Sequence, residues 1–313
     1  MRTFQNPVLS GFHPDPSVCR VGDDYYLVNS SFEFFPGVPI YHSRDLVNWR
    51  QIGYVLDRPG QLPLDGMRPS GGIYAPTIRH HDGTFYMITT NVGGGGNFYV
   101  TAGDPAGDWS DPVWLPDAPG IDPSLLFDDD GKVYYTGHRR KADARYPGDC
   151  EIWVRELDVA RGALVGEPVG VWDGHAKQSE YAEGPHLYKI NGTYYLTIAE
   201  GGTGIFHAVT VARSESPFGP FEGYIRNPIL THRHLRRTHE ISCTGHADLV
   251  DTPKGEWWLF FLGCRPVDGE FFPLGRETFL APVEWEDDWP HVNPQHGRAL
   301  LVERAPELEE HPW

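Results

Sequence analysis

Five copies of one sequence pattern constrain the fold of this chain more than any single motif does. Each copy holds a tight turn, a pair of adjacent aromatic residues and an apolar strand, as in DDYYLVNSS, DGTFYMITT, DGKVYYTG, NGTYYLTIAE and KGEWWLFFLG. The pairs begin at Tyr25, Phe85, Tyr134, Tyr194 and Trp257, and a spacing of about 50 to 60 residues suits a four-stranded propeller blade. DG and NG favour hairpin turns, while Val, Ile, Tyr and Trp favour strands.

Each copy continues into a second pair of predicted strands, which makes four strands per repeat. These outer strands lie at 40–53, 97–115, 150–172, 207–224 and 276–292. No stretch keeps apolar residues at three- and four-residue spacing for more than about two turns, so helices are not expected. Five such blades close into a ring without a long exposed edge. The sequence therefore predicts an all-β, five-bladed β-propeller that forms a single domain over residues 1–313.

Size and charge limit the partners of such a domain. The 313 residues are 40% hydrophobic, which is enough for a full core. The net charge of −17 leaves no basic block to neutralise phosphates, which argues against nucleic acid and against an anionic membrane as partners. The short basic stretch from His232 to His239 is interpreted as a solvated loop. A small substrate that is neutral or cationic fits this composition better.

Cysteine usage and the N-terminal residues predict a cytoplasmic protein. None of the four cysteines belongs to a Cys-x-x-Cys pair, so reduced thiols are expected. The N-terminus, MRTFQNPVLS, lacks the apolar core of a signal peptide. No apolar run approaches the roughly 18 residues needed to cross a bilayer.

Three acidic residues occupy one equivalent position of the repeat, just upstream of each turn where the innermost strand should start. The residues at this position are Asp15, Ala75, Asp122, Glu183 and His246. Because the first strands of all blades line the central channel of a propeller, we expect these residues to form a ring near one end of the axis. Three carboxylates in one cavity repel each other, so at least one should have a raised pKa.

Such a ring suits glycoside cleavage, in which one carboxylic acid protonates the leaving oxygen and another activates water or attacks the sugar. The alternative interpretation is that each acid only caps a turn, as Asp-Pro sequences often do. His246 is open to three interpretations: a neutral core residue, a contact to the sugar, or a ligand to a cation in the channel. The stretch FDDDGK, with Asp128 to Asp130, resembles a calcium loop but occupies the hairpin-turn position of its repeat, so it is predicted to be a turn.

Longer motifs resemble glycoside hydrolase family 43, which comprises β-xylosidases and α-L-arabinofuranosidases. They are GFHPDPSVCRVGDDYYLVNSSFEFFPGVPIYHSRDLVNW, GGIYAPTIRHHDGTFYMITTN, YAEGPHLYKINGTYYL and SCTGHADLV, and the resemblance runs from NPVLSGFHPDPS to PLGRETFLAPVEW. It implies inversion of configuration, with Asp15 as general base, Glu183 as general acid and Asp122 as modulator of the acid. Inversion needs the base and acid roughly 6.5 to 9.5 Å apart, which opposite sides of a propeller channel could supply.

The resemblance also implies the rest of the sugar site. Phe32 would be a wall of the pocket, Tyr74 would stand where related xylosidases have Trp, and Thr203 and Arg276 would donate hydrogen bonds to the substrate. Phe32 and Tyr74 could instead simply pack in the core. His246 would contact the substrate and a calcium ion in the channel, and since a lone imidazole is a poor calcium ligand, the other ligands would be mostly water.

The resemblance thus implies an exo-acting, inverting hydrolase that releases terminal β-D-xylose, α-L-arabinofuranose or both from small neutral xylo-oligosaccharides and arabinoxylan fragments. An arabinanase of the same fold and a non-catalytic sugar-binding propeller are the alternatives. A retaining enzyme of the invertase and levansucrase kind is disfavoured because the NDPNG and EC signatures are absent. Relatives commonly carry a C-terminal β-sandwich that this sequence lacks after ELEEHPW, so a more open pocket is expected.

Overall fold

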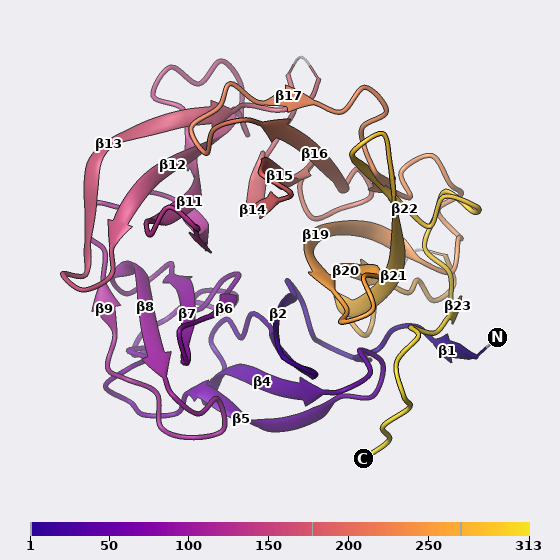
Figure 1. The fold of residues 1–313 in the computed structure, drawn as a ribbon, viewed down its shortest axis with the longest axis horizontal. Coiled ribbons are helices and arrows are strands. Elements are labelled where there is room, and N and C mark those ends of the chain that lie inside the picture. The colour runs from indigo at the N-terminus through magenta and orange to yellow at the C-terminus, as the bar shows by residue number, and fades with distance from the viewer. Residues whose placement is uncertain (1, 177, 270) are drawn as a thin grey trace.

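The five sequence repeats form the five blades of a propeller in the computed structural model, which describes residues 2–176, 178–269 and 271–313 (Figure 1). The blades surround a central axis, and the first strand of each blade contacts the first strands of its neighbours. The predicted all-β, five-bladed fold is therefore confirmed. No helix among the described residues is long and apolar enough to cross a membrane.

Each blade is an antiparallel sheet whose strands follow chain order from the axis outward. The blades consist of β2 (Ser17–Val21), β3 (Asp24–Val28), β4 (Gly37–Ser43) and β5 (Arg50–Leu56); β6 (Thr77–His81), β7 (Thr84–Asn91), β8 (Gly96–Ala102) and β9 (Val113–Trp114); β10 (Ile121–Phe127), β11 (Val133–Arg140), β12 (Cys150–Asp158) and β13 (Ala163–Trp172); β14 (Glu183–Ile190), β15 (Thr193–Glu200), β16 (Ala208–Ser214) and β17 (Glu222–Gly223); and β19 (Ser242–Asp251), β20 (Trp257–Cys264), β21 (Glu277–Glu286) and β22 (Trp289–Val292). A short strand, β18 (Leu230–Thr231), extends the fourth blade by pairing with the start of β16.

The N-terminal segment closes the ring by pairing with the C-terminal part of the chain. Strand β1 (Thr3–Gln5) pairs with β23 (Val302–Arg304), and Leu9 exchanges two backbone hydrogen bonds with Thr278 of β21. The side-chain amide of Asn6 donates to the Leu280 carbonyl oxygen at 2.8 Å. The segment that leads into the first blade is therefore fixed to the fifth blade.

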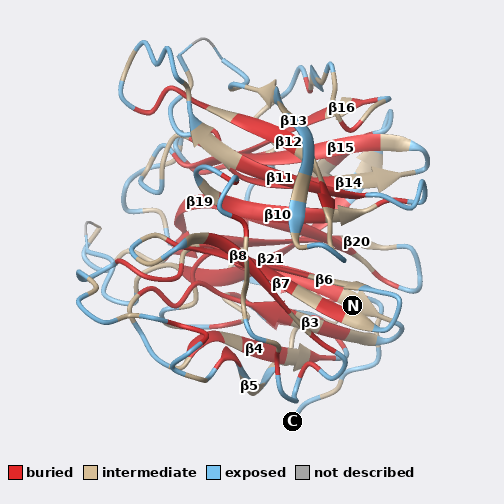
Figure 2. Ribbon diagram, turned by 90° about the vertical axis from the view of Figure 1, so that its left-hand side faces the viewer, coloured by how far each residue is buried: buried red, intermediate tan, exposed pale blue. Residues whose placement is uncertain are grey.

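The paired aromatic residues of the repeat fill the interfaces between blades. Successive strand residues point to opposite faces of a sheet, so each pair supplies one ring to each face of its blade. Tyr25 and Trp258 are fully buried together in the core between the fifth and first blades. Figure 2 shows the consequence, with buried strands stacked through the molecule and exposed residues in the connecting loops and in outer strands such as β13.

The described loops also agree with the sequence. Asp128 to Asp130 form the turn between β10 and β11, as predicted. The basic stretch is mostly an exposed loop, except that His232 is buried and its ring nitrogens bond to Ile241 and Ala299. All four cysteines are free and buried.

A buried ion pair lies in the central channel. The guanidinium of Arg79, on β6, bonds to both carboxylate oxygens of Asp248, on β19, at 2.9 and 3.2 Å. The Tyr188 hydroxyl donates to the same carboxylate at 2.6 Å, and the Ser17 hydroxyl donates to it at 2.7 Å. Burial alone would raise the pKa of Asp248, but Arg79 and His186 hold it well below its ordinary value.

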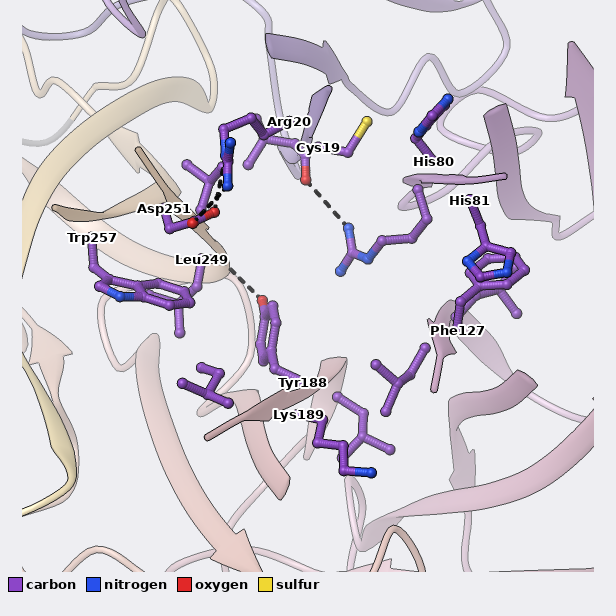
Figure 3. A pocket seen from close by; sticks show the side chains of 17 residues that line it. Cys19, Arg20, His80, His81, Phe127, Tyr188, Lys189, Leu249, Asp251 and Trp257 are labelled. Carbon is purple, nitrogen blue, oxygen red and sulfur yellow. Dashed lines mark hydrogen bonds and ion pairs between the residues drawn. The ribbon is translucent and has the colours of Figure 1, made fainter. Parts of the chain in front are cut away.

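This network separates the two ends of the channel. The C-terminal halves of the five inner strands line a cavity of ≈ 330 Å³ at one end, shown in Figure 3 with Tyr188, Arg20 and Asp251 among its lining residues. The five ring residues predicted from the repeat lie at the opposite, N-terminal ends of the same strands.

Replacing Asp248 by Asn should destabilise the protein strongly, because it leaves the buried Arg79 guanidinium without its counter-charge. We expect a loss of about 3 to 5 kcal/mol in the free energy of unfolding, measured by urea denaturation. The matched control is Asp251→Asn, which breaks the partly exposed ion pair with Arg20 and should cost about 1 kcal/mol or less. Equal losses in the two variants would contradict a special role for the channel network.

Candidate active site

All five ring residues predicted from the repeat register line one cavity of ≈ 290 Å³, at the end of the channel where the inner strands begin. Asp15 and Ala75 precede β2 and β6, Asp122 and Glu183 lie at the starts of β10 and β14, and His246 lies within β19. The same cavity is lined by the remaining residues expected to bind substrate, which are Phe32, Tyr74, Thr203 and Arg276. Ser70 and Ile121 also line it and were not expected.

Three of the five ring residues share a backbone conformation that is rare for side chains other than glycine. Asp15, Asp122 and His246 have φ values of 54°, 55° and 48°. Non-glycine residues in this left-handed region are uncommon, and they persist where the surrounding structure holds them. The repeated conformation supports the structural equivalence of these positions.

Asp15 is held by a donor on each of its carboxylate oxygens. The Ser30 hydroxyl donates to Oδ2 at 2.6 Å, and the Arg276 guanidinium donates to Oδ1 at 2.8 Å. Burial alone would raise the pKa of Asp15, but Arg276, His246 and Ser30 together hold it below its ordinary value. Asp15 is therefore an ionised carboxylate near neutral pH.

The pKa values of Asp122 and Glu183 are shifted in the opposite direction, upward. Burial and the repulsion of Asp15 raise the pKa of Asp122 to about 6, against opposing contributions that include the hydrogen bond from the Gly184 amide. Burial, followed by the charges of Asp122 and Asp15, raises the pKa of Glu183 well above its ordinary value. Among the described residues, none forms a hydrogen bond or ion pair with the carboxyl group of Glu183, although its backbone pairs with Ala199 in the sheet. Of the three acids, Glu183 is the one whose carboxyl group accepts no hydrogen bond from a neighbouring side chain or amide of the described chain, whereas Asp15 and Asp122 both do.

The cavity thus holds two carboxyl groups on different blades, one with a lowered pKa and one with a raised pKa. Asp15 belongs to the first blade and Glu183 to the fourth, so His246 of the fifth blade separates them on one side and Ala75 and Asp122 separate them on the other. A base and an acid that flank one cavity can remove a proton from water and deliver a proton to a leaving group. The turn-capping interpretation does not account for this arrangement.

Aromatic residues form one wall of the cavity. The rings of Phe32 and Tyr74 meet edge to face with centroids 5.4 Å apart, and the Arg276 guanidinium lies 5.5 Å from the Phe32 ring centroid. The Tyr74 hydroxyl donates to the Ser70 carbonyl oxygen at 3.2 Å. Both rings line the cavity and also pack against other aromatic residues, so the two interpretations of them do not conflict. Thr203 is exposed at the edge of the cavity.

Ser30 is the functional neighbour that the sequence interpretation missed. It follows β3, which runs antiparallel to β2, and its amide donates to the Pro14 carbonyl oxygen at 3.2 Å. Because β3 runs back toward the start of β2, a residue just past the second strand of a blade lies beside the ring residue of that blade. Extending the repeat alignment to that position could have found it.

His246 does not sit in a calcium site built from side chains. No three His, Cys, Asp or Glu residues within 2–176, 178–269 and 271–313 cluster as metal ligands. Its Nδ1 is 4.0 Å from Asp15 Oδ1, but that oxygen already accepts from Arg276. Calcium takes six to eight oxygen ligands, which these residues do not provide. The water-coordinated calcium ion stays a prediction.

The fold and the acid ring together define a five-bladed propeller with an acid-lined pocket of the kind that glycosidases use. The family model described as Glycosyl hydrolases family 43 matches residues 4–290. The chain therefore belongs to glycosyl hydrolase family 43, as the motifs indicated.

Relatives and solved structures agree with this assignment. A xylosidase/arabinosidase of Butyrivibrio fibrisolvens is 58% identical over 94% of this chain, and a non-reducing end α-L-arabinofuranosidase of Bacteroides ovatus is 48% identical over 100% of it. The chain spans 57% of the length of each of these relatives. A solved Bacteroides ovatus protein described as Xyloglucan PUL GH43B is 47% identical and superposes with a TM-score of 0.92, over 100% of this chain and 60% of that one.

Replacing Glu183 by Gln should stabilise the protein at neutral pH. Because the native state holds the Glu183 proton above the ordinary pKa of 4.5, it binds more protons than the unfolded state, and the free energy of unfolding falls as the pH rises. We expect the variant to gain about 1 to 3 kcal/mol at pH 7 and almost nothing at pH 4, measured by urea unfolding. The exposed control Glu309→Gln should change neither value. A gain independent of pH would refute the raised pKa.

Proposed function

We propose that this chain hydrolyses the terminal glycosidic bond of small neutral oligosaccharides with inversion of configuration. The observation that carries the proposal is the opposite pKa shift of Asp15 and Glu183 in one cavity. Inverting hydrolysis requires an ionised base on one face of the sugar and a protonated acid on the other. A sugar-binding propeller without catalysis would need neither.

Each acid then has a separate role. Asp15, aligned by Ser30 and Arg276, removes a proton from the water that attacks the anomeric carbon. Glu183 protonates the departing oxygen. Asp122 keeps the Glu183 proton in place, because its charge raises the pKa of Glu183. Arg276 and Thr203, which line the cavity, would donate hydrogen bonds to the sugar, and Phe32 and Tyr74 would form a wall against it.

The cavity and the relatives support a terminal pentose as the sugar released. A cavity of ≈ 290 Å³ closed beneath by the channel network suits a single sugar at a chain end better than a cleft that binds a polymer along its length. The names of the relatives include both xylosidase and arabinofuranosidase activities. We therefore propose release of β-D-xylose and of α-L-arabinofuranose from xylo-oligosaccharides and arabinoxylan fragments.

Proton NMR of the first sugar released tests the proposed mechanism. With p-nitrophenyl β-D-xyloside we expect α-xylose as the initial product, and with p-nitrophenyl α-L-arabinofuranoside we expect the β anomer. The Asp15→Ala variant is the control and should lower kcat by about 10²- to 10⁴-fold. Initial release of β-xylose, or full activity in the variant, would contradict the role of Asp15 as base.

Replacing Asp122 by Asn should move the alkaline limb of the pH profile of kcat/KM to lower pH. The limb reports loss of the Glu183 proton, and removing the neighbouring charge lowers the pKa of Glu183. A shift of about one pH unit is expected. The control Asp82→Asn, at an exposed turn, should leave both limbs in place. An unchanged alkaline limb in Asp122→Asn would show that Asp122 does not tune the acid.

A further inference from the structure

One exposed aromatic residue lies beside the proposed acid and has no role in the mechanism above. Tyr181 stands two residues before Glu183 and outside the cavity lining, with 39% of its surface exposed. The intervening residue, Ala182, is buried. Tyr181 therefore lies at the rim of the cavity on the side of the fourth blade.

Two neighbouring loops leave space for this ring. A Cβ atom added to Gly148 would lie 3.1 Å from the Tyr181 ring, and one added to Gly202 would lie 3.3 Å from it. Gly202 directly precedes Thr203, which lines the cavity. Glycines with left-handed backbones on both sides thus let the ring lie close to two backbones next to the site.

The backbone around Tyr181 is fixed by hydrogen bonds to the same loops. The Tyr181 amide donates to the Gly148 carbonyl oxygen at 2.8 Å, and the Gly201 amide donates to the Glu180 carbonyl oxygen at 2.8 Å. Tyr181 itself has a φ of 53°, which is uncommon for an aromatic residue. An exposed ring held in place by two neighbouring loops is a better binding surface than a mobile one, because little conformational entropy is lost on contact.

The direction of the reaction makes this side of the rim relevant. In an inverting displacement, water attacks from the side of the base and the leaving group departs on the side of the acid. With Asp15 on the first blade and Glu183 on the fourth, the sugar beyond the cleaved bond lies on the Glu183 side. The channel network closes the floor of the cavity, so this sugar extends outward past the rim.

We propose that Tyr181 binds the leaving-group sugar, a pyranose residue of the oligosaccharide, through its exposed ring. The C–H groups on one face of a pyranose are apolar and pack against an aromatic face, which removes apolar area of both groups from water. The proposal rests on the proposed glycosidase activity and adds the residue that selects an oligosaccharide over a substrate with a minimal leaving group.

The test compares two substrates that differ only in the leaving group, xylobiose and β-D-xylopyranosyl fluoride. In Tyr181→Asn, chosen because Asn tolerates the left-handed backbone, kcat/KM for xylobiose should fall about three- to tenfold while that for the fluoride stays unchanged. Tyr181→Phe keeps the ring and should retain the wild-type ratio. If the enzyme cleaves only arabinofuranosides, arabinofuranosyl xylobiose and α-L-arabinofuranosyl fluoride replace this pair.

The control variant is Phe34→Ala, which removes an exposed aromatic ring that packs against Phe12, on the first blade and on the side of the base. It should not change the ratio of the two kcat/KM values. Equal losses on both substrates in Tyr181→Asn, or a ratio equal to wild type, would overturn the proposal. A wild-type protein that cleaves neither substrate pair would overturn the proposed function instead.

Discussion

The buried ion pair between Arg79 and Asp248 is the interaction on which the rest of the structure depends. Five inner strands meet around the axis of the propeller, where the Asp248 side chain is fully buried and the Arg79 side chain is largely buried. The ion pair and its partners bind strands of the first, second, fourth and fifth blades to one another. Removing such a pair from water costs free energy, and its full set of hydrogen bonds offsets that cost.

Closure of the channel also creates the electrostatic conditions of the active site. Beneath the ring residues, the channel is occupied by Arg79, Asp248 and their hydrogen-bond partners. Figure 3 shows the separate cavity at the other end of the channel. The ring acids are therefore surrounded by protein, where burial raises a carboxyl pKa unless a cation compensates. Arg276 compensates for Asp15 across 261 residues of sequence, because the N-terminal segment is paired with the fifth blade. The contacts that close the ring of blades therefore also bring Arg276 next to Asp15, where it keeps the base ionised.

The blades and the acid ring could be predicted from the sequence because residues at the same position of each repeat occupy equivalent places in the blades. Aligning Asp15, Asp122 and Glu183 on the turn signals was enough to place them around one cavity. It could not predict the pairing of Arg79 with Asp248, since nothing local fixes which side chains meet across the axis. The contacts of Ser30 and Tyr181 depend on where loops return to the ring, and the role expected of Arg276 came only from family resemblance.

The positions of two arginines explain why three acids of the channel differ in the direction of their pKa shifts. Asp248 and Asp15 are both buried, and each binds a guanidinium, from Arg79 and Arg276 respectively. Their pKa values are lowered despite burial. Glu183 lies in the same channel without an arginine bonded to it, and its pKa is raised. Since desolvation acts on all three in the same direction, the placement of the guanidinium groups decides which acid remains available to donate a proton.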